Sequence, residues 1–420
     1  MDKIIIVGGG VAGLFVAREL SRHRYDITIL EATNRLGGRI HTIRNSSFTQ
    51  PVEKGVEFIH GNLPLTIQLL KEAGIEYNVV RGNMVRVVNG NWETQGDFTL
   101  GWDELMKKMN SIRQDTTMDE FLKENFSDEK YNELRTSVVR FANGFDLADT
   151  SRASVLALRE EWMGEEDKQH RVPGGFDQLI NFLEKECLES GVAILPSTAV
   201  TEINWQKNDV KVITSNGKTH DASKVIVTTS LGQFQSDQSI IFHPGIDNYF
   251  QAATKIGFGT VVKVMLEFKE AFWEEKKKGI GFLFTNEIIP TWWTQSPSSY
   301  PLLTGWAGGP QAWAVDDKDD ATILDMAIRS LSNVFQKTVG ELNQILIASA
   351  VVNWKNDPYS HGAYSYDTVE SIGAKKLLNT PTEETIFFAG EGFYEGPSPG
   401  TVEAALVSAR DVVEKIVSRE

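Results

Sequence analysis

The chain lacks the residues that disulfides and metal clusters need. It has one cysteine, Cys187, among 420 residues, so an intramolecular disulfide is impossible and a thiolate metal cluster is excluded. Its seven histidines are scattered along the sequence without the spacing of metal ligands, which argues against a zinc or iron site. We therefore expect no metal.

Long apolar runs and excess positive charge are also missing. No run approaches the roughly 18 apolar residues of a membrane helix, and the chain enters an apolar segment almost at once, which leaves no room for a signal peptide. We therefore expect a cytoplasmic protein with no membrane partner. The net charge of −15 repels phosphates and argues against nucleic-acid binding. It mildly favours cationic ligands.

What is present at the N-terminus is a strand–helix–strand pattern. Lys3 to Val7 is a short apolar run typical of a buried parallel strand. Val11 to His23 has apolar residues at helical spacing, and Asp26 to Glu31 reads as a second strand. The turn between strand and helix holds Gly8, Gly10 and Gly13. The pattern predicts a βαβ unit.

This unit predicts a dinucleotide site. The first glycine allows the tight turn, the second lets the backbone approach a pyrophosphate, and the third lets helix and strand pack closely. The helix N-terminus then faces the anion with free amides and a positive dipole. Glu31 ends the second strand, where a carboxylate can accept hydrogen bonds from ribose hydroxyls and would repel the 2′-phosphate of NADP.

A second glycine-rich segment favours FAD over NAD. Asn34 to Arg39 begins too soon after Glu31 for another ordinary helix. Gly37 and Gly38 expose backbone amides, and Arg39 can bring a guanidinium to the pyrophosphate. A simple NAD dehydrogenase does not need this second clamp.

Further along the chain, local patterns predict four more elements. They are a helix over Phe176 to Cys187, a hairpin around Asn216-Gly217, an alternating strand over Thr260 to Phe268, and a closing helix from about Thr401.

These motifs together resemble the flavin-containing amine oxidase superfamily, and its polyamine oxidase branch more closely than its monoamine oxidases. The resemblance recurs in family order along nearly the whole chain. Its segments are the glycine turn with Glu31, Leu36 to Thr42, Gly55 to Gly61, Val225 to Leu231, Lys263-Val264 followed by Phe272-Trp273, Trp354 to Tyr364, Phe388 to Glu391, and Gly400 to Glu403.

The resemblance implies an α/β fold, with a Rossmann-like FAD-binding domain of the amine oxidase type and an inserted α+β substrate domain. The FAD-binding domain would comprise 1–80, 171–255 and 356–420, and the substrate-binding domain 81–170 and 256–355. The residues expected to contact FAD are Gly8, Gly10, Gly13, Glu31, Gly38, Arg39, Gly55, Val200, Gly390, Glu391, Thr401 and Val402.

Two departures from the monoamine oxidase pattern narrow the expected chemistry. Ala363 stands where those enzymes carry the cysteine that binds flavin covalently, so we expect non-covalent FAD. Thr401 stands where they have a second active-site tyrosine. Threonine in place of tyrosine would widen the substrate-binding slot, and the chain has a net negative charge. Both features favour cationic secondary amines of the polyamine type.

The resemblance suggests three catalytic residues, each with a plain structural alternative. Lys263 would hold a water at flavin N5, unless it is an exposed strand lysine. His60 would orient the substrate or relay its proton, and Tyr364 would wall the substrate slot; both could instead be structural. The sequence leaves open whether Glu57, or the tryptophans at 292, 293, 306 and 313, contact the substrate.

The expected reaction is oxidation of an amine C–N bond to an imine, with dioxygen reduced to hydrogen peroxide. One alternative is an L-amino acid oxidase, which needs an arginine such as Arg140 or Arg159 for the substrate carboxylate. A flavin desaturase is a second, although Lys263 argues against it. A redox-silent FAD-binding protein is a third. The sequence leaves the oligomeric state open.

Overall fold

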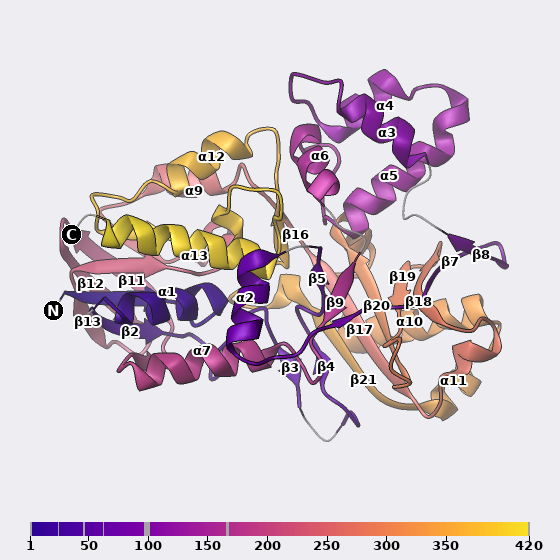
Figure 1. Cartoon of the computed structure of the whole chain (residues 1–420), viewed down its shortest axis with the longest axis horizontal. Coiled ribbons are helices and arrows are strands. Elements are labelled where there is room, and N and C mark those ends of the chain that lie inside the picture. The colour runs from indigo at the N-terminus through magenta and orange to yellow at the C-terminus, as the bar shows by residue number, and fades with distance from the viewer. Residues whose placement is uncertain are drawn as a thin grey trace.

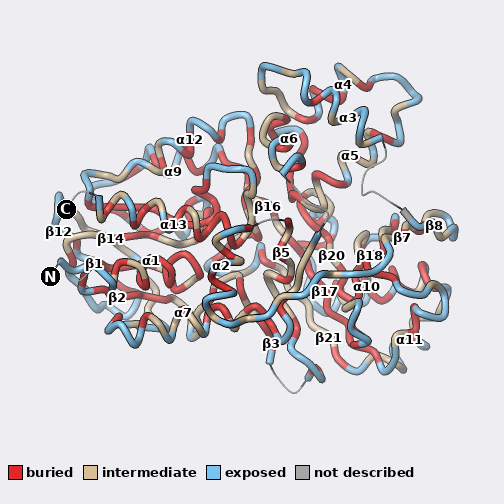
Figure 2. Tube along the Cα trace, in the orientation of Figure 1, coloured by how far each residue is buried: buried red, intermediate tan, exposed pale blue. Residues whose placement is uncertain are grey.

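A five-stranded sheet and a seven-stranded sheet, with smaller sheets and a separate group of helices around them, make up the described part of the molecule (Figure 1). The computed structural model describes residues 2–23, 25–44, 47–61, 63–95, 101–164 and 168–418. Buried residues follow the strands of both sheets and the inner sides of the helices that cover them (Figure 2). No helix in this described part of the chain is both long and apolar enough to cross a membrane.

The first sheet is parallel, and its central strand is the N-terminal apolar run. The predicted strands at 3–7 and 26–30 pair in register, from Lys3 beside Asp26 to Val7 beside Leu30. The sheet order is β10 (Ala193–Leu195), β2 (Asp26–Leu30), β1 (Lys3–Val7), β14 (Lys224–Val227) and β23 (Ile386–Phe388). Strands from distant parts of the chain thus lie side by side.

Both faces of the parallel sheet are covered, as its continuous apolar strands require. Ile4 and Ile6 pack into a core under helices on one face, whereas Ile5 and Val7 pack into the core on the other. The first group of helices is α1 (Val11–Ser21), α7 (Asp177–Glu189), α13 (Val402–Val417) and α2 (Pro64–Glu72). The predicted helices at 176–187 and from about 401 are confirmed.

A second layer covers the opposite face. It contains an antiparallel hairpin around Asn216-Gly217, as predicted, in which Val212 pairs with His220. Its strands are β13 (Thr219–Ala222), β12 (Asp209–Thr214), β11 (Val200–Gln206) and β15 (Ile241–His243). Its helices are α8 (Leu231–Gln235), α9 (Asp247–Ala253) and α12 (Ser371–Leu378).

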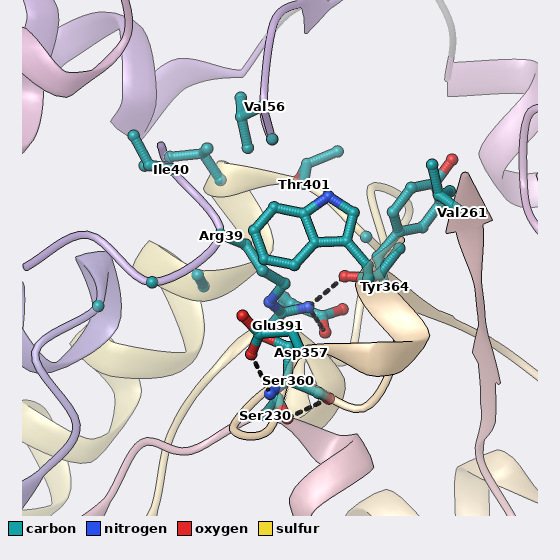
Figure 3. A pocket seen from close by; sticks show the side chains of 18 of the residues that line it. Arg39, Ile40, Val56, Ser230, Val261, Asp357, Ser360, Tyr364, Glu391 and Thr401 are labelled. Atoms are coloured by element: carbon teal, nitrogen blue, oxygen red, sulfur yellow. Dashed lines mark hydrogen bonds and ion pairs between the residues drawn. The ribbon is translucent and has the colours of Figure 1, made fainter. Parts of the chain in front are cut away.

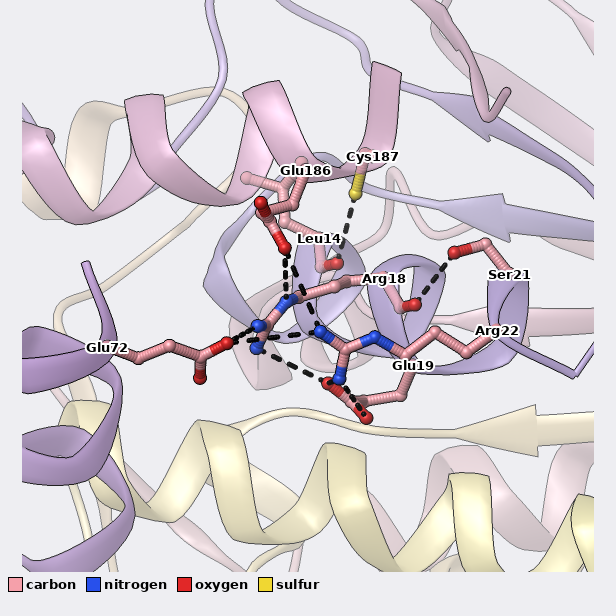
Figure 4. Close-up of polar contacts among 8 residues, drawn as sticks. All are labelled: Leu14, Arg18, Glu19, Ser21, Arg22, Glu72, Glu186 and Cys187. Atoms are coloured by element: carbon pink, nitrogen blue, oxygen red, sulfur yellow. Dashed lines mark hydrogen bonds and ion pairs between the residues drawn. The ribbon is translucent and has the colours of Figure 1, made fainter. Parts of the chain in front are cut away.

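A buried arginine ties three of the covering helices together (Figure 4). Arg18 of α1 pairs with Glu72 of α2 and lies 3.6 Å from the carboxylate of Glu186 in α7. On the same helix pair, Cys187 Sγ donates to the carbonyl of Leu14 at 3.4 Å. Because a buried arginine without partners is costly, these contacts fix how α1, α2 and α7 sit on the sheet.

The second sheet is mostly antiparallel and carries helices on one face. Its order is β21 (Leu346–Asn353), β17 (Val261–Phe268), β20 (Leu302–Gly308), β19 (Thr291–Trp293), β18 (Ile280–Thr285), β7 (Asn83–Val88) and β8 (Asn91–Gln95). The covering helices are α10 (Asp320–Phe335) and α11 (Val339–Ile345).

The predicted alternation in the strand at 260–268 is confirmed, with both of its faces buried. Val262 and Val264 pack into the core under α10. Val261 and Lys263 point to the other face of the sheet, where Val261 packs beside Trp354. Lys263 is therefore a buried lysine and not an exposed one.

The helical group packs around its own apolar core, and the remaining elements are short. The group contains α3 (Trp102–Met109), α4 (Met118–Asn125), α5 (Asn132–Gly144) and α6 (Val155–Gly164). The short strands are β3 (Thr42–Ile43), β4 (Val52–Glu53), β5 (Ile59–His60), β6 (Asn78–Val79), β9 (Gln169–Arg171), β16 (Gly257–Gly259) and β22 (Tyr364–Tyr366). The 3-10 turns are η1 (Glu129–Tyr131), η2 (Phe272–Glu275), η3 (Gly309–Ala314), η4 (Trp354–Asn356) and η5 (Glu391–Phe393).

Candidate functional site

A cavity of about 900 Å³ is lined by residues from both sheets and from α5. At one end it reaches the turn after β1, and at the other it reaches the second sheet. This volume is at the upper end for a small-molecule site. All the cofactor and catalytic residues expected from the sequence line this cavity, with the exception of Gly13.

The glycine turn is closed at Gly13 and open at Gly10. A side-chain carbon on Gly13 would lie 2.1 Å from the carbonyl oxygen of Gly8, so this position packs helix against strand and does not face the cavity. A carbon on Gly10 would meet no protein atom within 4 Å. The N-terminus of α1 thus presents bare backbone to the cavity, as a bound pyrophosphate requires.

Glu31 lies at the cavity wall beside this turn. Its two carboxylate oxygens accept from the amide of Gly9 at 2.7 Å and the amide of Thr33 at 2.8 Å. A carboxylate has about four acceptor sites, so it can hold the turn and still accept from a ribose hydroxyl. The glycine turn and this acid therefore fit a dinucleotide.

Arg39 makes an ion pair that the sequence did not predict (Figure 3). Its Nη1 lies 2.6 Å from Oε1 of Glu391 and donates to the carbonyl of Ala363 at 2.6 Å. Glu391 also accepts from Ser365 Oγ at 2.7 Å. Gly55 is required beside this pair, because a side chain there would collide with the carbonyl of Arg39. Segments far apart in the sequence thus meet at the cavity wall.

The N-terminus of α13 is aimed at the same space. Thr401 caps the helix by accepting from the amide of Ala404 at 3.1 Å, and Val402 begins its first turn. The positive end of the helix dipole therefore faces the cavity. Glu403 turns away and accepts from the amides of Leu65 and Thr66. Gly38, Val200 and Gly390 also line the wall.

A buried charge cluster lies at the end formed by the second sheet. Lys263 is 1% exposed, and its Nζ lies 2.8 Å from Oε2 of Glu57. Glu57 Oε1 accepts from Trp293 Nε1 at 2.9 Å and lies 3.2 Å from Nη2 of Arg171. Burial alone would raise the pKa of Glu57, but Lys263 and Arg171 outweigh it and hold this pKa at about 2. Glu57 is therefore paired with protein cations.

His60 and Tyr364 both contact Phe145. The His60 ring meets the Phe145 ring edge-on at 5.1 Å, and the Tyr364 hydroxyl donates to the Phe145 carbonyl at 2.5 Å. Burial lowers the pKa of His60 to about 4 and raises that of Tyr364. His60 Nδ1 is buried with no hydrogen-bond partner among the described residues. A neutral, unpartnered imidazole thus faces the cavity.

Only some of the tryptophans and arginines considered as substrate contacts line the cavity. Trp293 and Trp306 line the cavity, with ring centres 5.7 Å apart. Trp292 is core, and Trp313 is 60% exposed. Of the two arginines considered for a carboxylate, only Arg140 lines the cavity, among the described residues.

Sequence reasoning missed Arg171, Phe145 and Arg86, which also line or support the cavity. None of them stands in a motif, and only the three-dimensional fold brings them to this wall. No group of histidine, cysteine and acidic side chains suited to a metal ion occurs among the described residues.

Comparison with known proteins agrees with this geometry. The family model of flavin-containing amine oxidoreductases matches residues 11–417. Polyamine oxidase 2 of Arabidopsis thaliana is 24% identical over 99% of this chain and 89% of its own length. Lysine-specific histone demethylase 1 homolog 3 of the same plant is 25% identical over 97% of this chain, which spans only 29% of that relative.

Solved structures share the fold along its full length. A putrescine oxidase bound to putrescine superposes with a TM-score of 0.82 at 17% identity, covering 100% of this chain and 99% of the other. Cyclohexylamine oxidase from Brevibacterium oxydans gives 0.81 at 19% identity with the same coverage. Since the family model spans almost the whole sequence, the chain belongs to the flavin-containing amine oxidoreductase family.

Proposed function

We propose that the protein is an FAD-dependent amine oxidase that converts an amine C–N bond to an imine and reduces dioxygen to hydrogen peroxide. One observation carries the proposal. A single cavity joins the glycine turn at Gly8 and Gly10 to the buried cluster of Lys263 and Glu57. A dinucleotide and a substrate can therefore meet inside it.

FAD would be held without a covalent bond by the parallel-sheet side of the molecule, in the Rossmann manner. The FAD-binding domain would comprise 1–80, 171–255 and 356–420, and the substrate-binding domain 81–170 and 256–355. Gly10 and Gly38 offer backbone, Glu31 an acceptor, and Thr401 the start of a helix. Ala363 offers no nucleophile at the usual attachment position.

When bound, FAD supplies the acceptor for the hydride equivalent that leaves the carbon beside the amine nitrogen. The protein's part is to deliver an uncharged amine. Burial lowers the pKa of His60 to about 4, so its neutral imidazole would orient the substrate from the cavity wall and would not itself hold the proton of an ammonium. Tyr364 and Trp306 wall the slot with aromatic surface and exclude water.

The cluster around Lys263 places charge at the reacting end. Two cations, Lys263 and Arg171, exceed the one anion paired with them, Glu57, so these three groups carry one net positive charge. The nearby Glu53 adds little negative charge below a pH of about 7, because burial raises its pKa to about 7. A fixed positive charge in a poorly solvated site favours the negative charge that develops as oxygen is reduced. This role for Lys263 does not require its direct contact with a substrate.

A secondary amine of the polyamine type is the proposed substrate class. Thr401 leaves more space than a second aromatic ring would, and polyamine oxidases are among the relatives. A specific observation also supports a carboxylate-bearing amine as a second candidate, since Arg140 lines the cavity.

A peroxide-coupled screen of the FAD-loaded protein tests the proposal. It should include spermine, acetylated polyamines, benzylamine and L-amino acids. We expect peroxide from secondary amines, with kcat/KM above that of benzylamine by about tenfold or more, a difference of roughly 1.4 kcal/mol. Peroxide only from benzylamine or L-amino acids would overturn the secondary-amine assignment, and no peroxide with any amine would overturn the oxidase assignment.

A further inference from the structure

A straight row of side chains crosses the second sheet along the cavity floor. Each member pairs in register with the next across neighbouring strands. The row runs in the order Lys263, Trp306, Thr291, Phe284 and Arg86. Directly paired residues point to the same face of a sheet, and all of these residues line the cavity. The row therefore connects the proposed reacting end to Arg86.

The strand spacing gives this row a length. It spans β17, β20, β19, β18 and β7, and neighbouring strands lie about 4.8 Å apart, so Lys263 and Arg86 are separated by about 19 Å of sheet. The cavity thus has two ends, one at the Lys263 cluster and one at Arg86.

Arg140 faces Arg86 from the opposite wall. It lies on α5, whose residues Ser137, Arg140, Phe141 and Gly144 line the cavity at helical spacing. The helix is held over the row, because Trp306 Nε1 donates to the Gly144 carbonyl at 2.7 Å. Partial burial and then the nearby charge of Arg86 lower the pKa of Arg140. Arg140 is exposed, so this end of the cavity reaches solvent.

One acid, Glu93 of β8, pairs in register with Arg86 and so shares its face of the sheet. Neither guanidinium forms a hydrogen bond or ion pair with any residue that the structure describes. Glu57 is already neutralised by Lys263 and Arg171. Glu161, another acid on the wall, lies near Tyr364, where burial and then the charges of Asp146 and Glu161 raise the pKa of the tyrosine. Two like charges therefore line one cavity without an ion pair to a described residue, which suits an anionic group.

We propose that Arg86 and Arg140 bind an anionic end group, a carboxylate or a phosphate, on a long amine whose nitrogen reacts at the Lys263 end. The inference rests on the proposed amine oxidation and specifies its substrate class. An α-amino acid cannot meet both ends, because its carboxylate is attached to the reacting carbon. A polyamine would place an ammonium beside the two arginines, so among secondary amines a polyamine should be a poorer substrate than an anion-ended amine.

Matched long secondary amines test the proposal. They share one N-methylaminoalkyl chain and end in a carboxylate, a phosphate, an uncharged amide or a second ammonium. Using the FAD-loaded protein, we expect kcat/KM to be highest for one of the two anions and lowest for the ammonium. The better anion identifies the end group. Equal values for anion and amide, or a preference for ammonium, would overturn the inference.

Variants of Arg86 and Arg140 test whether these two residues cause the preference for an anionic end group. R86Q and R140Q should each lower the ratio of kcat/KM for anion over amide by about tenfold, as expected for a charge-assisted hydrogen bond at a partly exposed site. R140K, which keeps the charge, should retain part of the preference. The control is R81Q, because Arg81 is exposed just before β7 and outside the described cavity lining. An unchanged ratio in both glutamine variants would overturn the assignment.

Binding measurements keep this test separate from the oxidase proposal. A long dicarboxylate should change the tryptophan fluorescence of the FAD-loaded protein, because Trp306 lies in the row. R86Q should weaken that binding by about tenfold. If the amide-ended amine is oxidised as well as the anion-ended amines, the proposed anion site is overturned and the oxidase function is retained. If the dicarboxylate binds but no amine is oxidised, the proposed oxidase function is overturned and the anion site is retained.

Discussion

The Nζ of Lys263 lies 2.8 Å from the carboxylate of Glu57, and both side chains are buried. A buried ion pair pays a large desolvation cost, which good geometry and further hydrogen bonds must offset. Here Trp293 and Arg171 supply them. The arrangement fixes a charged lysine in the wall of the cavity, where the sequence alone could not distinguish it from a surface residue.

Replacing this lysine tests its charge. K263M keeps the bulk of the side chain and removes the charge, so oxidation of reduced flavin by oxygen should slow by about a hundredfold, or roughly 3 kcal/mol. FAD should still bind, because the glycine turn and Glu31 lie elsewhere. Stopped-flow mixing of reduced protein with oxygenated buffer measures the rate. K269M, at an exposed lysine just after β17, is the control. A K263M rate within about twofold of wild type would return Lys263 to a structural role.

Glu53 predicts a pH dependence of stability. Its burial raises the pKa to about 7, although the amide of Phe176 donates to it at 2.6 Å. The folded protein therefore holds this proton more tightly than the unfolded chain, and stability falls as pH rises from about 4.5 to 7. The loss is up to roughly 3 kcal/mol. Urea unfolding at several pH values between these limits measures the free energy of unfolding. In E53Q this free energy should fall less steeply with rising pH than in the wild type. Parallel curves for E53Q and wild type would contradict the assignment.

Substitution of Gly10 should weaken FAD binding without affecting folding. G10A places a methyl group in open cavity space, so the apoprotein should keep its stability to within about 0.5 kcal/mol. FAD should bind at least about tenfold more weakly, because the backbone can no longer approach the pyrophosphate. Fluorescence titration with FAD measures the affinity. G373A, at an exposed glycine of α12 with equally open space, should bind FAD normally. Normal binding by G10A would contradict the assigned turn.

The flavin should be released by acid. Ala363 cannot form a thioether, and Cys187 is buried in α7 against the carbonyl of Leu14. Acid precipitation of the yellow protein should leave a colourless pellet and a yellow supernatant. A washed pellet that keeps its colour would show a covalent bond.

The sequence predicted the features that depend on local chemistry. The glycine turn, the buried strands and the capped helix at Thr401 each follow from a few neighbouring residues, and the structure has them. The sequence also predicted that side chains alternate between the two faces of the strand around Lys263. It could not predict which of these faces is buried. Both are buried, because α10 covers one and the cavity wall the other.

The sequence could not predict contacts made by residues outside motifs. Arg171 reaches Glu57 only because β9 pairs with β5. Arg86 reaches the cavity only because β7 pairs with β18 in the second sheet. The Arg39–Glu391 pair joins two known motifs, but nothing local shows that their side chains meet. Each of these contacts is set by long-range strand pairing.

Anaerobic spectroscopy tests amine oxidation most directly. The FAD-loaded protein is mixed without oxygen with a long secondary amine, and its absorbance near the flavin band is followed. The band should bleach, and admitting oxygen should restore it with one peroxide formed per flavin reoxidised. A flavin band that is unchanged by every secondary amine, primary amine and amino acid offered would contradict amine oxidation and leave a redox-silent FAD-binding protein.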